Sequence, residues 1–159
     1  MGVLKEISLQ LVAQELESCT LDSADYGWEI SPLDEALLTF QVKMLSSIDN
    51  EPYRLTVQFD NYPEHPLLID FIDPVNGQVG TRRAYPMTEQ GFFHATGPSI
   101  CHPASRKAYR GYQGIHNEWD FVGWQKNPNV GSLTNIKAIL QAVHFRINDK
   151  RLYRGRMEK

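Results

Sequence analysis

The chain has 159 residues, 42% hydrophobic residues and a formal net charge of −3, values that fit one globular domain spanning positions 1–159. No run approaches the roughly 18 apolar residues that a membrane helix needs, which excludes a membrane protein of that kind. The chain has only two cysteines, Cys19 and Cys101, and no apolar leader follows the first methionine. We therefore expect a reduced, cytoplasmic protein rather than a disulfide-framed secreted one.

Charge is divided unevenly along the chain. Positions 1–80 carry 14 acidic and 3 basic residues, whereas positions 81–159 carry 5 acidic and 13 basic residues. Such a division can steer a charged partner toward one half of a molecule, depending on how the fold arranges the two halves.

The first predicted element is a helix. Between Val3 and Glu17 apolar residues recur at intervals of three and four with charged residues between them, which predicts an amphipathic helix. The stretch LDSADYG, at 21–27, is rich in small and acidic residues and is expected to form a turn.

Strand periodicity follows the turn. Apolar residues alternate with more polar ones over 38–44, 55–59 and 67–71, and short polar stretches separate these runs. Short connections favour antiparallel neighbours. We expect an antiparallel meander of four strands, with the stretch around Trp28 as its opening strand.

Regularity fades from Asp73 to about Gly131, and an irregular segment of that length inside a compact domain is more often functional than idle. Helical spacing then returns up to Ile147, with Ser132 as the expected N-cap. The basic tail NDKRLYRGRMEK is expected to be frayed. The order of helix, antiparallel meander, irregular active-site segment and C-terminal helix predicts an α+β fold.

Three local features in this order resemble the ubiquitin-conjugating (E2-like, UBC-like) family. The stretch NYPEHPLLIDF, at 61–71, is similar to the Tyr-Pro-x-x-Pro sequence that opens the fourth strand of that family. Within GPSIC, Cys101 occupies the place of the active-site cysteine. Trp119 or Trp124 then precedes a Pro-containing loop and a helix, as in the family. The features cover most of the chain, and their departures from the family pattern resemble divergent bacterial members.

The resemblance implies a conjugating function. Cys101 would accept a ubiquitin-like protein from an E1-like activating enzyme and pass it to a target protein. No cofactor is expected, because ATP use belongs to the activating enzyme. The family's His-Pro-Asn motif before the cysteine is replaced here by FFHATGPSIC, in which His94 is present and the oxyanion-stabilising asparagine is not. Asn117 is the candidate replacement.

A thioester-forming cysteine reacts as the thiolate, and cationic neighbours lower a thiol pKa from its ordinary value of about 8.5. His102 adjoins Cys101, and basic residues follow at 106, 107 and 110, so the sequence predicts an electropositive setting for the thiol. His94, His102 and His116 are candidate proton acceptors or orienting groups. An oxyester would instead implicate Ser99 as the nucleophile.

The same residues are also compatible with a metal site. Cys101, His116 and Glu118, together with His94, offer the ligand types of a zinc site, which would make the protein a non-catalytic E2-like binding module. Cys19 lacks such neighbours and is expected to pack in the core. The tryptophans and Phe121 are expected to anchor the long loop.

The basic and aromatic run at 106–112 has the composition of a nucleic-acid patch. Because the run is short and the pI is about 5.9, a solvated face or a contact for an acidic protein fits it better. No nucleic-acid or membrane partner is expected.

Overall fold

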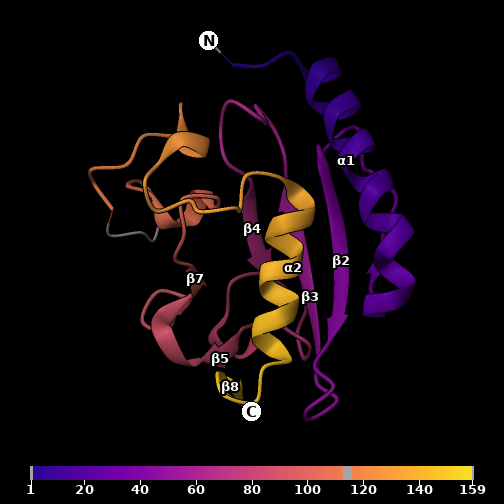
Figure 1. The fold of residues 1–159 in the computed structure, drawn as a ribbon, viewed down its shortest axis with the longest axis vertical. Coiled ribbons are helices and arrows are strands. Elements are labelled where there is room, and N and C mark those ends of the chain that lie inside the picture. Colours follow the sequence, from indigo (N-terminus) through magenta and orange to yellow (C-terminus); the bar gives the residue numbers. More distant parts are fainter. Residues whose placement is uncertain (1, 113–115, 159) are drawn as a thin grey trace.

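A computed structural model describes residues 2–112 and 116–158. At its centre is an antiparallel sheet in which consecutive strands are neighbours, so the predicted meander is confirmed (Figure 1). Its strands are β1 (Glu29–Ile30), β2 (Thr39–Leu45), β3 (Pro52–Gln58) and β4 (Leu68–Phe71).

Alternation along the strands gives the sheet one buried face. In β2, Phe40, Val42 and Met44 are buried while the residues between them remain partly exposed. Phe40 pairs with Val57 and Val42 pairs with Leu55, so the buried side chains of adjacent strands lie together. Each such burial contributes roughly 1.5–3 kcal/mol.

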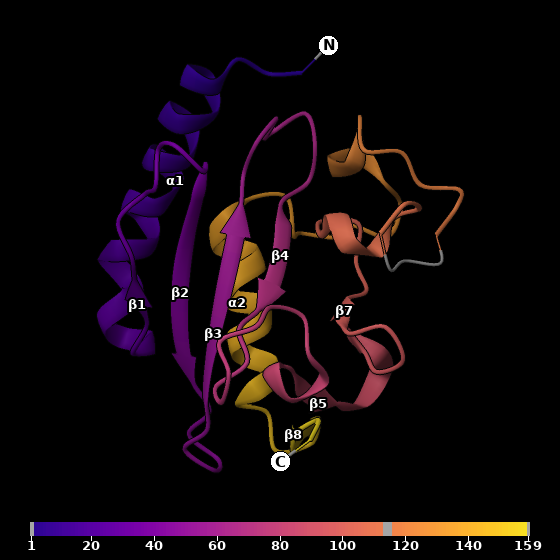
Figure 2. The same cartoon turned by 180° about the vertical axis from the view of Figure 1, so that it is seen from behind.

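Two helices complete the core. Helix α2 (Ile136–Ile147) lies in front of the strands in Figure 1 and behind them in Figure 2, and helix α1 (Lys5–Tyr26) runs alongside β2 at the edge of the sheet and packs against α2. Helix α1 buries Val12 and Leu16, and α2 buries Ile139 and Val143. The α+β class predicted from the sequence is therefore confirmed, with helices and sheet around one core.

The ends of both helices differ from the predictions. Helix α1 continues through the expected turn to Tyr26 and ends at Gly27, whose φ of 73° lies in the left-handed region that favours glycine. The turn prediction was wrong because the polar residues of 21–26 fit the exposed side of a helix equally well. The expected cap at Ser132 was also wrong, since the side chain of Asn135 accepts a hydrogen bond from the Ala138 N–H at 2.9 Å.

The C-terminal tail is ordered, so the prediction of a frayed end was wrong. Strand β8 (Tyr153–Arg156) pairs antiparallel with β5 (Pro86–Thr88). The hydroxyl groups of Tyr53 and Tyr153 lie 2.6 Å apart, and Tyr153 donates to Asp49 at 2.8 Å. Arg156 is buried and binds Glu51 at 3.1 Å. These long-range contacts attach the tail to the turn between β2 and β3.

The irregular segment contains short elements between β4 and α2. Strands β6 (Phe93–His94) and β7 (Ser99–Ile100) form a hairpin. In the described part of this segment, 3-10 turns form at η1 (Arg82–Ala84), η2 (Glu89–Gly91), η3 (Arg106–Ala108) and η4 (Trp124–Lys126).

Part of the uneven charge of the sequence is neutralised within the fold. Five basic residues of the second half form ion pairs with acidic residues of the first half. The pairs are Arg83–Asp73, Arg106–Asp60, Lys107–Asp70, Lys137–Asp22 and Arg156–Glu51. No helix within 2–112 and 116–158 is long and apolar enough to cross a membrane.

Candidate functional site

The backbone around Cys101 is fixed by the β6–β7 hairpin. Cys101 directly follows β7, and its N–H donates to the carbonyl of Phe92 at 2.8 Å. Pairing of Phe93 with Ile100 places both apolar side chains in the core. The Cys101 side chain itself is only half-buried, so the hairpin presents a thiol at the surface.

A chain of contacts runs from the thiol to a carboxylate. Cys101 Sγ lies 3.5 Å from His116 Nε2, and His116 Nδ1 lies 3.2 Å from Glu118 Oε1. With the Nδ1 proton donated to the carboxylate, Nε2 presents its lone pair to the thiol. We call Cys101, His116 and Glu118 the relay. Cys101 is in the position of a nucleophile, His116 in that of a base, and Glu118 in that of the acid that orients the base. This order is typical of sites in which a base activates a nucleophile by removing its proton.

Trp119 fixes the plane of the imidazole in the relay. Its ring stacks on that of His116 with centroids 3.5 Å apart and an interplanar angle of 4°. Tyr109 packs edge-on against Trp119 and donates its hydroxyl proton to the carbonyl of Pro103 at 2.6 Å. The imidazole is therefore held in its plane by stacking and in its rotation by Glu118.

The protonation states of the relay follow from burial and hydrogen bonding. Burial raises the pKa of the Cys101 thiol, so the predicted electropositive activation is wrong. The pKa of Glu118 is lowered by its own backbone N–H and then by the ring of His116, which keeps the carboxylate ionised. At neutral pH the thiol is protonated, and His116 is the group in position to take its proton.

His102 does not join the relay, although it adjoins Cys101 in sequence. Its Nδ1 accepts the Ala104 N–H at 3.0 Å, and its ring lies beside Phe92. Burial, followed by the charge of Arg146, lowers the pKa of His102 to about 4. A neutral imidazole at pH 7 contributes no positive charge to the setting of the thiol.

The basic residues after Cys101 also point elsewhere. Arg106 is 4% exposed, and its guanidinium donates to Asp60 and to the carbonyl of Pro66. Lys107 is likewise buried, with Nζ 2.8 Å from Asp70 Oδ2. The prediction of a solvated basic face is therefore wrong at these two positions.

The remaining predicted site residues lie around the relay without joining it. His94 Nδ1 accepts the Gly97 N–H at 3.2 Å and so braces the β6–β7 turn. Ser99 is 3% exposed, which makes it a poor nucleophile for a large acyl donor. Asn117 stands between His116 and Glu118 in the sequence, and it is exposed. Among residues 2–112 and 116–158, no hydrogen bond joins His94 or Asn117 to Cys101.

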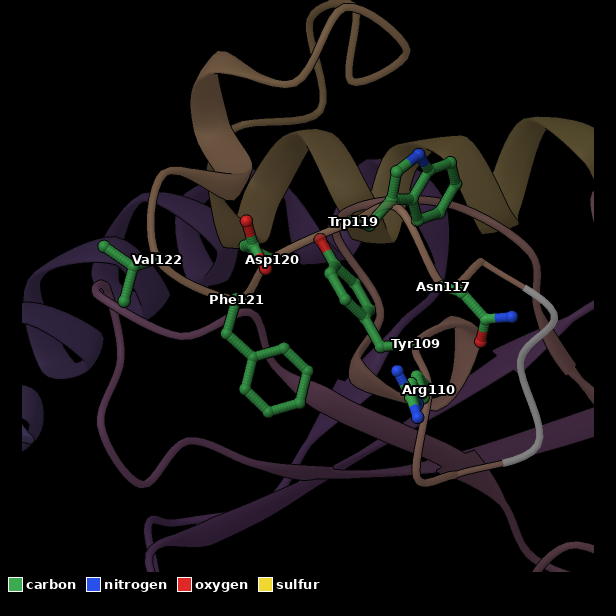
Figure 3. A pocket seen from close by; sticks show the side chains of 7 residues that line it. All are labelled: Tyr109, Arg110, Asn117, Trp119, Asp120, Phe121 and Val122. Atoms are coloured by element: carbon green, nitrogen blue, oxygen red, sulfur yellow. The ribbon is translucent and has the colours of Figure 1, made fainter.

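Trp119 also lines an open depression, whose lining includes none of the three relay residues. Its volume is about 700 Å³, and its lining is mixed aromatic and polar. Figure 3 shows the rings of Tyr109, Trp119 and Phe121 around it. The other lining residues are Arg110, Asn117, Asp120 and Val122. Trp119 therefore contacts the imidazole of the relay and also lines the depression.

The expected anchoring role of the aromatic residues is confirmed for Trp124 and Phe121. Trp124 is 1% exposed, and its indole N–H donates to the carbonyl of Pro63 at 2.8 Å. Phe121 packs between His65 and Tyr109. Cys19 is fully buried as predicted, and burial raises its pKa to about 11.

The zinc alternative is not supported by the arrangement of its four ligands. Cys101 and Glu118 approach opposite nitrogens of one imidazole, so as placed they cannot bind the same ion as that ring. His94 is engaged in its own turn. Within the part of the chain that the structure describes, no group of three or more His, Cys, Asp or Glu side chains is arranged to hold a metal ion. That the protein needs no cofactor stays a prediction.

The sequence named His116 among the candidate proton acceptors near Cys101, and it named Glu118 only as a ligand in the alternative zinc site. The structure arranges Cys101, His116 and Glu118 in series. The support from Trp119 was missed. The spacing of three residues between His116 and Trp119 could have indicated this support, because a turn can bring the Trp119 ring back onto the His116 ring. Comparison of the chain with protein-family models, curated proteins and solved structures finds no significant match.

Proposed function

We propose that the protein is a divergent, bacterial-type E2-like conjugating protein of the cytoplasm. It would accept a ubiquitin-like protein from an E1-like activating enzyme as a thioester on Cys101 and deliver it to a target protein. The observation that carries the proposal is the partly buried Cys101 thiol, which follows a hairpin strand and lies in contact with the imidazole of His116.

The arrangement of the fold supports the same proposal. The chain runs from a helix through a four-stranded meander to a long segment bearing the cysteine, and then to a second helix, in the order that the family resemblance implies. The Tyr-Pro-x-x-Pro stretch lies directly before β4. Its Tyr62 is buried, with its carbonyl accepting from Ser8, and the Pro63 carbonyl accepts from Trp124. This stretch therefore connects the sheet both to α1 and to the segment that carries the site.

The loading reaction is a thiol exchange at a carbonyl carbon. The sulfur of Cys101 forms a bond to the C-terminal carbonyl of the modifier while the bond from that carbon to the donor thiol breaks. The Cys101 proton passes to His116 Nε2 and from there to the departing thiolate. A thiol whose pKa is raised by burial needs such a proton acceptor, and the contact of 3.5 Å supplies one.

Loading can be tested without the natural activating enzyme by using ubiquitin bearing a C-terminal mercaptoethanesulfonate thioester. We expect intact-mass analysis to show one adduct, released by dithiothreitol, on the wild-type protein and on the Cys19→Ala and Ser99→Ala variants. Cys101→Ala should give none. Equal loading of Cys101→Ala would contradict the proposal, and a dithiothreitol-resistant adduct that Ser99→Ala abolishes would move it to an oxyester.

A further inference from the structure

The geometry points to a second step at the same site. We propose that His116, oriented by Glu118 and Trp119, is the general base that discharges the acyl group from Cys101 to a primary amine, so that transfer needs no separate ligase. This inference rests on the proposed function, because it concerns the fate of the same thioester.

The imidazole of His116 lies close to the position of the reacting carbon. In the acylated protein the carbonyl carbon is bonded to Cys101 Sγ, which lies 3.5 Å from His116 Nε2. An amine that attacks this carbon therefore brings its proton within reach of Nε2. General bases act at such distances, directly or through one water molecule.

The imidazole is also held in a fixed orientation by two neighbours. The Glu118 carboxylate holds Nδ1 at 3.2 Å, and the Trp119 ring covers one face at 3.5 Å. A neighbouring carboxylate stabilises the imidazolium that forms when the base takes a proton. Loading needs only a brief transfer of the thiol proton, whereas aminolysis leaves a proton on nitrogen that must be removed for products to form. The relay is suited to this second demand.

An acceptor also needs space near the site. The depression of about 700 Å³ is lined in part by Trp119, and its polar groups include the carboxylate of Asp120. An amine-bearing side chain held there would lie beside Trp119, the residue that stacks on the His116 ring.

The discharge step balances without any further reactant. The amine lone pair forms the carbon–nitrogen bond, and the carbon–sulfur bond breaks with its electron pair going to sulfur. The amine proton passes to His116 Nε2 and then to the Cys101 thiolate. The products are an amide and the original neutral thiol and imidazole, so the relay is ready for another cycle.

Positions of the other polar groups agree with this assignment. His102 is turned toward Ala104, and His94 toward Gly97. Among the residues that the structure describes, His116 is the imidazole in hydrogen-bonding contact with the thiol. Glu118 acts through His116 and is a positioning residue, whereas His116 is the catalytic residue of the step.

The test separates discharge from loading. Wild type, His116→Gln, Glu118→Gln and Glu118→Asp are loaded with ubiquitin mercaptoethanesulfonate thioester at alkaline pH, where the thiolate forms without a base. After desalting to pH 7.5, L-lysine is added and loss of the thioester is followed by mass. We expect discharge to fall about 100-fold in His116→Gln, since a general base contributes roughly 10²–10⁴-fold. His144→Gln, which changes a histidine on α2 and keeps an acceptor for Trp28, is the matched control.

The discharge rate, measured at unchanged thermal stability, distinguishes a positioning role of Glu118 from a purely structural one. We expect Glu118→Gln to lower the discharge rate about 10-fold and Glu118→Asp to recover part of that loss, with all variants sharing one thermal midpoint. Equal discharge by wild type and His116→Gln would overturn the inference while leaving the proposed function intact. A Cys101 that cannot be loaded even at alkaline pH would instead overturn the proposed function.

Discussion

Arg106 provides a sharp test of how the segment after Cys101 is built. Its guanidinium lies 3.1 Å from Asp60 Oδ1, and it donates to the carbonyl of Pro66 at 3.0 and 3.1 Å. It also donates to the carbonyl of Asp60 at 2.9 Å. Truncation to Ala removes all of these donors at once. The buried Pro66 carbonyl then loses its partner and Asp60 loses its counter-charge.

Breaking a buried ion pair by removing one partner costs about 3–5 kcal/mol. Because the Asp60 side chain is 33% exposed and recovers part of its hydration, we expect the lower end for Arg106→Ala, about 3 kcal/mol. For a chain of this size that corresponds to a thermal midpoint lower by roughly 6–12 °C.

Urea unfolding followed by tryptophan fluorescence measures this loss directly. Arg110, an exposed neighbour four positions away, supplies the control, and Arg110→Ala should change stability by less than about 0.5 kcal/mol. Arg106→Lys keeps the charge but not the planar fork, so an intermediate loss is expected. If Arg106→Ala and Arg110→Ala were equally stable, the hydrogen bonds of Arg106 to Asp60 and Pro66 would not stabilise the fold as proposed.

Three further predictions concern titration, thiol access and the tail. Burial lowers the pKa of His102 from 6.5 to about 4, so the unfolded chain binds more protons than the folded protein between these pH values, and stability should fall as the pH drops from 6.5 to 4. The urea midpoint should fall less between these two pH values in His102→Gln than in the wild type. An identical fall in both proteins would refute this prediction. Iodoacetamide should label Cys101 in the folded protein and reach buried Cys19 only after unfolding, as peptide mass mapping would show; labelling of both in the native state would contradict the core described here. Tyr153→Phe removes two hydrogen bonds and should lower the free energy of unfolding, measured in urea, by about 1–2 kcal/mol. Tyr112→Phe changes an exposed ring and should leave the free energy of unfolding unchanged. Equal effects of the two substitutions would mean that these hydrogen bonds do not hold β8.

Local periodicity was sufficient to predict the central architecture. Strand β2 and its neighbours alternate with a period of two, and α2 repeats at three and four, because burial on one face imposes these patterns directly. The tail could not be predicted in this way. Strand β8 is ordered by pairing with β5 and by the contact of Tyr153 with Tyr53, and such long-range partners leave no local periodicity.

The candidate site shows the same division. The sequence indicated which residue types gather in the irregular segment, but adjacency misled the assignment of their roles. His102 and Arg106 follow Cys101 closely and still point away from it, because Arg106 finds its partners about 40 positions earlier, at Pro66 and Asp60. The partner of the thiol is His116, 15 positions later. Turn geometry in a segment without regular structure decides such contacts, and periodicity does not encode it.

The rate at which folded Cys101 is loaded shows whether His116 activates the thiol. Wild-type protein and the same chain unfolded in urea are each mixed with ubiquitin mercaptoethanesulfonate thioester at pH 7.5, and adduct formation at Cys101 is followed by mass. In the unfolded chain the thiol reacts with an ordinary pKa and no base. The relay predicts faster loading in the folded protein, despite the raised pKa of the thiol, and loss of that advantage in His116→Gln. Loading of the folded protein at or below the unfolded rate would contradict the account.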